Sequence, residues 1–582
     1  MGRLRDGVGR DQLTAELEAN SASYRESFGA HGDAANDVNV EPLVDAVVGE
    51  RKSTFTALVG AALAVLAIAC ANVAALYLGW RAARQRETAI RAALGASRWR
   101  LVAEIFGEAL TIAALAGVVG TIIAAAALFA LSDLLAAHLP SGTAVRLDPS
   151  AAAVGIFSVV ASMCVIGLGP ILKLNALGNL TTAQRGSSTS IAGSRFRAGL
   201  VVAETALSVA LLVVAILLLV SLARLLTTSP GFDGTQVAAG YVNLPSDRYD
   251  SDERNLAFHL AVIERLGTMP GVEGAAAVFG LPFHDENYAH TYLPAGEPVV
   301  PPSERMRAGL RIVSEDYFRL MGMRIVAGRS FNADDRGSAP RVCIINESLH
   351  RRLGAGAATL GRVLLRGRNA DQGCEIVGVV ADVKTNGLKE STPDEIFYSV
   401  RQLPRRDTFY VVRTTGDPDA AAGLLRSAVS EQDSRIPVSR FASMNARYAR
   451  MLGAERVMGG IISALAVAAV ALATLGLFAV LSHAVINRTA EIGIRMAMGS
   501  SRGAVVGLIV QQGLGLVVAG VVIGSAVAWG ASQLLSAQLF GIESAGPVYL
   551  VVAAIFLIIG GLAALGPALR GASIDPVAAL RR

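Results

Sequence analysis

Residues 54–80 read TFTALVGAALAVLAIACANVAALYLGW and contain no charged side chain. A transmembrane helix needs about 20 mostly apolar residues to cross a hydrocarbon core about 30 Å thick. This run is long enough, and similar runs recur along the chain. The chain is 53% hydrophobic and 17% charged, whereas soluble domains average roughly 25% charged residues. This composition excludes an intrinsically disordered protein, argues against a fully soluble enzyme, and indicates a membrane protein.

Seven apolar runs predict seven membrane-spanning helices. The uncharged stretch 503–542 is too long for one span, so we place a helix over its first part. The predicted spans are 54–80, 109–132, 151–172, 200–222, 458–486, 505–534 and 548–569. We therefore expect a polytopic α-helical membrane protein.

Lys and Arg side chains indicate the orientation of these helices. They concentrate in 81–100, 173–197, 488–502 and 570–582, while the short alternate loops 133–150 and 535–547 hold only Arg146. Short cytoplasmic loops carry an excess of Lys and Arg. All four basic segments are cytoplasmic if the N-terminus lies outside, which also places residues 1–53 and the long insert 227–457 outside. The sequence begins with a polar stretch and lacks the pattern of a signal peptide.

A motif recurs in the two halves of the chain. Residues 87–98, ETAIRAALGASR, match 491–502, EIGIRMAMGSSR, without a gap. The segments around Pro170 and Pro567, each near the end of a span, also match. Each half thus contains a span, a basic loop, two further spans and a basic tail. Parallel repeats of this kind suit transport proteins whose halves surround a common axis.

The repeated loop has a readable local structure. Its apolar residues four apart, Ile90 and Leu94 or Ile494 and Met498, share one face of a short helix. Its Arg follows its Glu by four residues, the favourable order for an exposed ion pair. A Gly then ends the helix, and Ser97 or Ser501 can cap the next one. The loop either turns the chain on the cytoplasmic side or forms a docking surface, and the recurrence favours docking.

The insert 227–457 is predicted to be a mixed α+β domain. A helix should begin after Asp250 or Ser251 and stop at Gly267, and another should begin at Asp417-Pro418, with Pro at the first helical position. The β-branched or aromatic runs 342–345, 376–380 and 409–412 indicate strands.

Four cysteines in a chain of 582 residues cannot form a disulfide framework. Cys70 and Cys164 fall in predicted spans, where they act as small apolar residues. Cys343 and Cys374 lie in or beside predicted strands. An oxidising exterior permits a disulfide between them, but nothing in the sequence brings them together, which favours two buried thiols.

These motifs resemble the MacB/FtsX-like family of bacterial ABC transporter permeases, in the form with two permease halves in one polypeptide. The segments that carry the resemblance are 86–98, 200–208, 229–233, 316–322, 328–329 and 575–581. The resemblance implies an extracytoplasmic MacB-like periplasmic core domain at 227–457. It implies FtsX-like three-helix modules at 54–185 and 458–582, and a linker with the first span of the second half at 186–226. Residues 1–53 would be the remnant of a first outer domain, so the chain looks truncated at its N-terminus.

The resemblance also implies the function. A cytoplasmic ABC ATPase dimer would drive movement of the outer domain, a mode of export called mechanotransmission, from the bacterial inner membrane. The basic loops would couple the two proteins through Glu87, Arg91, Gly95, Arg98, Glu491, Arg495, Gly499 and Arg502. Further implied partners are a periplasmic adaptor and an outer-membrane channel, with the lipid bilayer as the surrounding medium and no nucleic acid.

The chain does not carry the phosphate-binding motif of an ATPase. That motif is Gly-x-x-x-x-Gly-Lys-Ser/Thr, and at Lys52-Ser53 both glycine positions hold other residues, Ala46 and Arg51. We therefore expect the ATPase in a partner subunit and predict no catalytic residue, cofactor or metal in this chain.

Two other classes of function stay open. The outer domain could make the chain a regulator or scaffold that acts on a cell-wall enzyme or a lipoprotein. A membrane-anchored ectoenzyme is the third class, for which the candidate is the segment from His284 to His290, with possible metal ligands. Its spacing fits no common zinc motif and favours a solvated loop.

Two features within the spans also admit two interpretations. Glu204 is a functional candidate because a charge in lipid is costly, or its carboxylate reaches the interface. Gly520 and Gly524 have the spacing that lets helices approach closely, either within the bundle or in a dimer.

Overall fold

The computed structural model describes residues 4–5, 7, 9–28, 40–42, 52–83, 98–136, 155, 188–284, 288–301, 304–354, 359–366, 372–487, 489–498, 500–535, 539–542 and 546–573. The chain divides into two compact units. We call Met1–Gly49 with Leu225–Gly453 the sheet unit, and Glu50–Arg224 with Ala454–Arg582 the helical unit.

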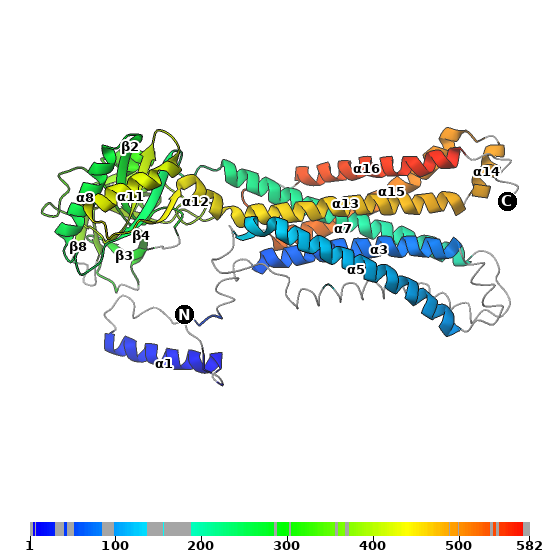
Figure 1. The fold of residues 1–582 in the computed structure, drawn as a ribbon, viewed down its shortest axis with the longest axis horizontal. Helices are drawn as coiled ribbons and strands as arrows, with labels where there is room; N and C mark the ends of the chain where they lie inside the picture. The colour runs from blue at the N-terminus through cyan, green and yellow to red at the C-terminus, as the bar shows by residue number, and fades with distance from the viewer. Residues whose placement is uncertain are drawn as a thin grey trace. The chain divides into compact units, whose positions relative to one another are not determined.

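Long apolar helices make up the helical unit (Figure 1). They are α3 (Lys52–Ala83), α5 (Arg98–Ala136), α7 (Ser188–Thr227), α13 (Gly453–Asn487), α15 (Arg502–Leu534) and α16 (Gly546–Ala572), with the short α14 (Thr489–Ala497) between α13 and α15. Within the described residues, 6 helices are long and apolar enough to cross a membrane. They correspond to six of the predicted spans, and the remaining one, 151–172, lies outside the described residues apart from Gly155. The fold class expected from the sequence is thereby confirmed.

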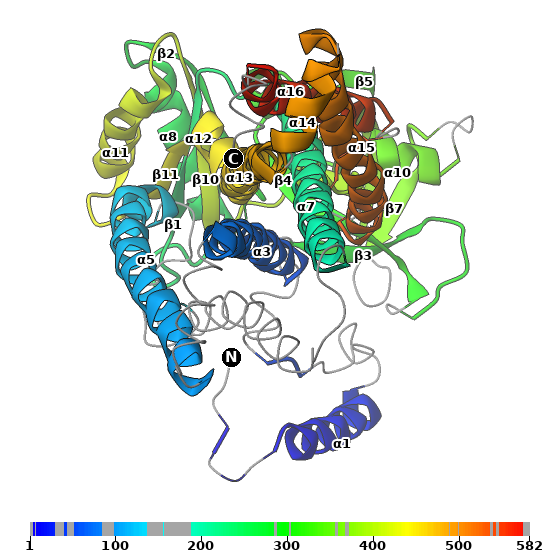
Figure 2. The same cartoon turned by 90° about the vertical axis from the view of Figure 1, so that its right-hand side faces the viewer.

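Helix α7 is the centre of this bundle. Buried residues make up 61% of its span, against 22% for α3 and 33% for α13. One side of α7, including Val213 and Leu217, packs in an apolar cluster with residues of α13, α15 and α16. Another side, including Leu211 and Ala215, packs with residues of α3 and α13. Figure 2 shows α7 between α13 and α15.

Two glycines on α15 allow the close approach of α7. A Cβ on Gly520 would lie 2.5 Å from Cβ of Thr205, and one on Gly524 would lie 2.5 Å from the carbonyl oxygen of Ala206. Real Cβ atoms do not approach backbone so closely, so only glycine fits at Gly524 without a shift. Of the two interpretations of this glycine pair, packing within the chain is therefore the one that the structure supports.

The sheet unit contains one mixed sheet of 11 strands. They are β1 (Val237–Asn243), β2 (Val272–Phe279), β3 (Ala289–Pro294), β4 (Met306–Val313), β5 (Ile325–Gly328), β6 (Val342–Asn346), β7 (Val363–Arg366), β8 (Gln372–Val380), β9 (Glu395–Ser399), β10 (Asp407–Thr414) and β11 (Ser439–Ser443). The helical elements are α1 (Arg10–Phe28), α8 (Asp252–Gly267), α9 (Tyr317–Leu320), α10 (Glu347–Arg352), η3 (Pro418–Ala420), α11 (Ala421–Gln432) and α12 (Met444–Met451).

Strand order explains how the sheet is arranged. Neighbours follow the order β11-β1-β10-β2-β4-β3-β7-β8-β6-β9, and β5 pairs with β8. Parallel pairing of β4 with β9 joins the end of this path back to its middle, so that β4, β3, β7, β8, β6 and β9 form a closed ring. Strands β11, β1, β10 and β2 extend from that ring as an antiparallel sheet.

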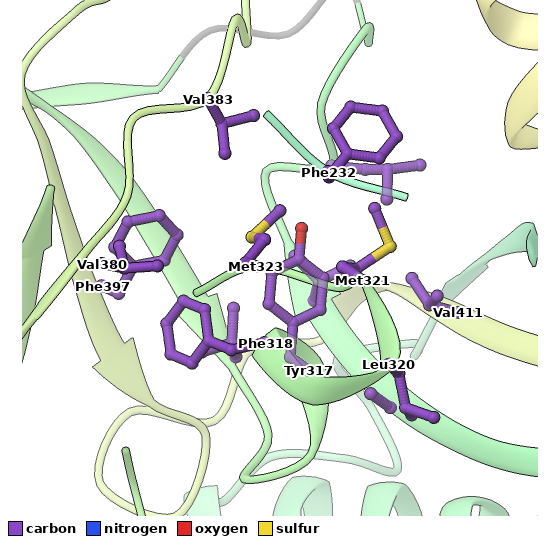
Figure 3. Packing of buried hydrophobic residues seen from close by; sticks show 14 of the residues in the cluster. Phe232, Tyr317, Phe318, Leu320, Met321, Met323, Val380, Val383, Phe397 and Val411 are labelled. Atoms are coloured by element: carbon purple, nitrogen blue, oxygen red, sulfur yellow. The ribbon is translucent and has the colours of Figure 1, made fainter. Parts of the chain in front are cut away.

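The sheet unit has three apolar clusters, and alternation along β10 contributes side chains to two of them. In β10, Phe409 and Val411 point into one apolar cluster, and Tyr410 and Val412 point into another. The first cluster gathers around α9, where Phe318 lies 5.2 Å from Phe397, ring centre to ring centre (Figure 3). The second includes the buried faces of α8 and α11. Side chains of successive strand residues point to opposite faces, so one strand contributes to both cores.

The predicted elements of this domain are confirmed where we named them. Strands β6, β8 and β10 cover the three runs chosen from the sequence. Ser251, rather than Asp250, caps α8 and accepts a hydrogen bond from the backbone N–H of Arg254. The helix expected at Asp417-Pro418 begins with the short η3 and continues as α11 to Gln432.

Candidate functional site: the repeated basic loop

The second copy of the repeated loop forms the short helix α14 between two long helices. Glu491 and Arg495 lie one turn apart, and Nη2 of Arg495 donates to Oε1 of Glu491 over 2.8 Å. Both side chains are about half exposed. The expected ion pair therefore forms on the surface of the helix, where such a pair contributes roughly 0.3–0.5 kcal/mol to helix stability.

The end of the loop also follows the predicted pattern. Ser501 has extended backbone angles, and its side chain accepts a hydrogen bond from the backbone N–H of Ala504, which caps α15. Helix α15 then begins at Arg502, whose side chain is exposed. The predicted helix-ending residue Gly499 lies outside the described residues.

Helix α14 has one buried face and one exposed apolar face. Ile492 is buried in a cluster with Val485 of α13, with Val505 and Ile509 of α15 and with Ala568 of α16, and Met496 packs against the same cluster. The pair singled out from the sequence lies on the other side, since Ile494 is 51% exposed and Met498 is 84% exposed. The sequence thus identified two apolar residues of one face but missed Ile492 and Met496, which anchor the helix.

A small pocket opens beside this helix. The ion-paired side chains of Glu491 and Arg495 line it on one side, and Gln512 and Leu508 of α15 line it on the other. The surface around α14 therefore combines exposed apolar side chains with paired charges. Such a surface is typical of the contact regions between proteins, in which an apolar centre is surrounded by polar groups.

The first copy of the loop lies largely outside the described residues. Glu87, Arg91 and Gly95 are among the residues that are not described, and so is the predicted cap Ser97. Helix α5 begins at Arg98, the position that corresponds to Arg502 in the second copy. The two copies therefore share the start of the following helix at the same place in the motif.

The structure separates the histidines of the candidate metal cluster. Nε2 of His284 lies 3.0 Å from Nη1 of Arg440, whereas Nε2 of His290 lies 3.1 Å from the hydroxyl of Tyr398. Burial lowers the pKa of His290 to about 4, with a smaller effect from the charge of Arg366. Among the described residues, no group of three His, Cys, Asp or Glu side chains could hold a metal ion.

Cys343 and Cys374 are neighbours in the sheet unit. Both are buried free thiols, as the sequence favoured, and Sγ of Cys343 lies 3.6 Å from the carbonyl oxygen of Cys374. Burial raises the pKa of the Cys343 thiol well above its usual range. A thiol in this state is a poor nucleophile, so Cys343 is not a candidate for a catalytic residue.

Comparisons with known proteins identify the two parts of the chain separately. The family model described as MacB-like periplasmic core domain matches residues 203–428. The model described as FtsX-like permease C-terminal matches residues 59–177 and again residues 463–576. The two matches to one model coincide with the two halves that the internal repeat defines.

Curated relatives match part of this chain. The macrolide export ATP-binding/permease protein MacB of Chromobacterium violaceum is 26% identical over 277 residues, which cover 46% of this chain and 42% of that protein. The probable syringafactin export ATP-binding/permease protein SyfD of Pseudomonas syringae pv. tomato is 26% identical. That match covers 50% of this chain and 46% of that protein. The uncharacterized ABC transporter permease YknZ of Bacillus subtilis is 24% identical. That match covers 48% of this chain and 71% of that protein. The match thus spans less than half the length of the MacB and SyfD relatives.

Solved structures of outer domains also match. The periplasmic region of MacB from Actinobacillus actinomycetemcomitans is 14% identical, with a TM-score of 0.27, and the match covers 38% of this chain and 94% of that chain. The extracellular domain of the noncanonic ABC-type transporter YknZ from Gram-positive bacteria is 17% identical, with a TM-score of 0.25. That match covers 35% of this chain and 100% of that chain.

Proposed function

Since the chain belongs to the MacB/FtsX-like family of ABC transporter permeases, we propose that it is the permease subunit of an ABC transporter whose ATPase is a separate cytoplasmic protein. The chain is a multi-pass protein of the inner membrane with an extracytoplasmic domain, and its sequence contains no phosphate-binding loop. We infer that the energy for movement comes from a partner that binds nucleotide, as the family implies. The observation that carries this proposal is the exposed face of α14, described above.

Helix α14 is suited to bind such a partner. Its outer face presents Ile494 and Met498, which are 51% and 84% exposed, next to the pair Glu491–Arg495. Its inner face is fixed to α13, α15 and α16 through Ile492. A force applied to α14 would therefore reach three long helices at once, because the packed side chains between them resist compression. We assign the same role to the first copy, with Glu87, Arg91, Gly95 and Arg98, and to Gly499 and Arg502 in the second.

The proposed movement would travel along two continuous helices. Helix α13 runs for 35 residues from the end of the sheet unit to the start of α14, about 50 Å at 1.5 Å per residue. Helix α7 runs for 40 residues and leads into the sheet unit. Within the sheet unit, the hydroxyl of Tyr448 on α12 donates to the carbonyl oxygen of Leu225 over 2.9 Å. This bond connects the chain segments that continue into α13 and α7, so displacement of either helix should move this part of the sheet unit.

We propose export as the outcome of this movement. Two relatives are named as macrolide and syringafactin export proteins, and a moving outer domain can act on a substrate without a path through the bilayer. In cells, copurification of an adaptor and an outer-membrane channel would support export. Copurification of a cell-wall hydrolase in their place would favour a regulatory role.

The ATPase can be identified by site-specific photocrosslinking in intact cells. A photoreactive amino acid at Ile494 or Met498 should capture a protein whose sequence contains Gly-x-x-x-x-Gly-Lys-Ser/Thr, as read by mass spectrometry. Ile558 of α16, which is 63% exposed in the middle of an apolar span, is the matched control and should capture no such protein. The proposal is wrong if the positions on α14 capture no ATPase in cells that contain the complete transporter.

A further inference from the structure

Two buried polar side chains lie where three helices of the helical unit meet. Asn72 comes from α3, Glu204 from α7 and Gly476 from α13. Glu204 is 2% exposed and Asn72 is 7% exposed. A Cβ on Gly476 would lie 2.3 Å from Oε2 of Glu204 and 2.4 Å from Oδ1 of Asn72. Two side-chain oxygens therefore converge on the place where Gly476 has no side chain.

The orientation of the Asn72 amide follows from its other contact. Nδ2 of Asn72 donates a hydrogen bond to the carbonyl oxygen of Leu472 over 2.8 Å. A carbonyl can only accept, so exchanging the two ends of the amide would place two acceptors against each other. The amide oxygen of Asn72 is thus the atom directed toward the carboxyl group of Glu204.

The carboxyl group has no cation beside it in the described bundle. Oε2 of Glu204 is buried and has no hydrogen-bond partner among the described residues. Spans 54–80 and 503–542 contain no charged residue. On α7 the nearest charged residue is Arg197, seven positions, or about two turns, before Glu204. On α13 the nearest titratable residue is His483, seven positions after Gly476.

Two acceptor oxygens that face each other in an apolar bundle repel unless a proton or a cation lies between them. An ionised carboxylate in such a place also costs several kcal/mol of desolvation, and intramembrane acids without a function are rare. A protonated carboxyl group removes both difficulties, because its O–H can donate to the amide oxygen. Among the described residues, no side chain donates a hydrogen bond to Oε2.

We propose that Glu204 is a proton-binding site in the core of the helical unit. The carboxylate takes one proton from solvent, and the resulting O–H donates to Oδ1 of Asn72, which joins α7 to α3 over Gly476 of α13. Release of the proton leaves a charge and an unpaired acceptor, so proton occupancy is linked to how tightly these helices pack. The sequence left open whether Glu204 has a function or extends its carboxylate to the membrane interface. The second interpretation does not fit, because the Glu204 side chain is enclosed by the bundle. This proposal does not depend on the identity of the ATPase.

Infrared spectroscopy of the purified full chain in lipid nanodiscs tests the site directly. At pH 7, the wild type should show the C=O stretching band of a protonated carboxyl group, and Glu204→Gln should lack that band. Glu108→Gln, which removes another acid beside an apolar run, is the matched control and should keep it. Asn72→Leu should shift the band to higher frequency, because the carboxyl group loses its acceptor. Gly476→Ala should displace both oxygens and change the band in the same direction.

Each outcome bears on the proposal. Gln can still donate an N–H to Asn72, so Glu204→Gln should fold; if it does not, the shift in Asn72→Leu alone decides, because that variant retains the carboxyl group. A wild type with no protonated band and with a carboxylate band that Glu204→Gln removes would overturn the proposal. So would a band that disappears when sodium chloride is added at constant pH, since a metal cation would then be the ligand.

Discussion

Ile492 and Ile494 lie two residues apart on α14 and have opposite surroundings, with 6% and 51% of their surfaces exposed. Successive helix residues are about 100° apart around the axis, so these two side chains point in nearly opposite directions. Ile492 holds α14 to the bundle, and Ile494 leaves an apolar surface open. This difference predicts different effects for the same substitution.

Ile492→Ala should destabilise the helical unit by about 2 kcal/mol, because truncating a buried Ile leaves a cavity. Ile494→Ala should change stability by less than about 0.5 kcal/mol but should weaken assembly with the ATPase. Thermal unfolding in detergent and copurification of the ATPase measure the two effects. Equal loss of stability in both variants would contradict the assignment of the two faces.

Charge reversal tests the coupling role of the ion pair. Arg91→Glu with Arg495→Glu should uncouple ATP hydrolysis from export, measured as ATPase activity without substrate-dependent transport. The exchange variant Glu491→Arg with Arg495→Glu keeps a pair at the same spacing, so its helix should form with at most a few tenths of a kcal/mol of change. Normal transport by the double Arg→Glu variant would refute a role of these side chains in coupling.

Much of this architecture could be predicted from the sequence, because the bilayer imposes its own rules. An uncharged run of 20 or more residues has few alternatives to a spanning helix. Local signals were also sufficient at Ser251 and Ser501, where a cap depends only on residues within one turn. Both cap residues accept hydrogen bonds from backbone N–H groups three residues later.

Contacts between distant segments could not be predicted in this way. Asn72 and Gly476 are 404 positions apart, the same separation as the two copies of the repeated loop, so they occupy corresponding positions in the two halves. The repeat does not show that these positions meet each other or Glu204, so the surroundings of Glu204 required the packed bundle. Apolar residues at 492, 494 and 496 of α14, and at 498 directly after it, occupy both faces of the helix. A hydrophobic pattern cannot then tell which face is buried, and only the tertiary packing decides.

The glycines of α15 give a test of the bundle. Gly524→Ala would place a Cβ 2.5 Å from the carbonyl oxygen of Ala206, and such overpacking costs typically about 1–3 kcal/mol. Gly530→Ala on the same helix meets nothing within 4 Å, and Ala is the better helix former by about 1 kcal/mol. Thermal unfolding in detergent should show loss of stability in the first variant and none in the second. Similar behaviour of the two variants would argue against the close packing of α7 on α15.

His259 should make the sheet unit sensitive to acid. Its Nε2 lies 2.6 Å from the carbonyl oxygen of Arg405, which can only accept, so Nε2 carries the hydrogen and Nδ1 accepts from the hydroxyl of Tyr410 at 2.7 Å. Burial lowers the pKa of His259 from 6.5 to about 4, opposed by its hydrogen bond to Arg405. Between pH 6.5 and about 4, the imidazole of His259 is mostly protonated in the unfolded chain and mostly neutral in the folded chain. Stability should therefore fall as the pH decreases from 6.5 to 4, by at most about 3 kcal/mol.

Hydrogen exchange of α8 measures this effect in the full chain, after correction for the intrinsic pH dependence of exchange. The free energy of opening should decrease with acid in the wild type, and His259→Gln should show a shallower slope over the same range. The three tryptophans, Trp80, Trp99 and Trp529, are all in the helical unit, so tryptophan fluorescence cannot replace this measurement. An identical slope in the variant would rule out His259 as the source.

The central claim is that α14 lies on the cytoplasmic side and the sheet unit on the other. Cysteine labelling in whole cells tests it, in a background in which Cys70, Cys164, Cys343 and Cys374 are replaced by Ala. Met498→Cys, at a side chain that is 84% exposed, should react with a membrane-impermeant maleimide only after the inner membrane is permeabilised. Asp252→Cys, at an exposed position of α8, should react while the inner membrane is intact. Labelling of Met498→Cys with an intact inner membrane would contradict the account, because no cytoplasmic ATPase could then reach α14.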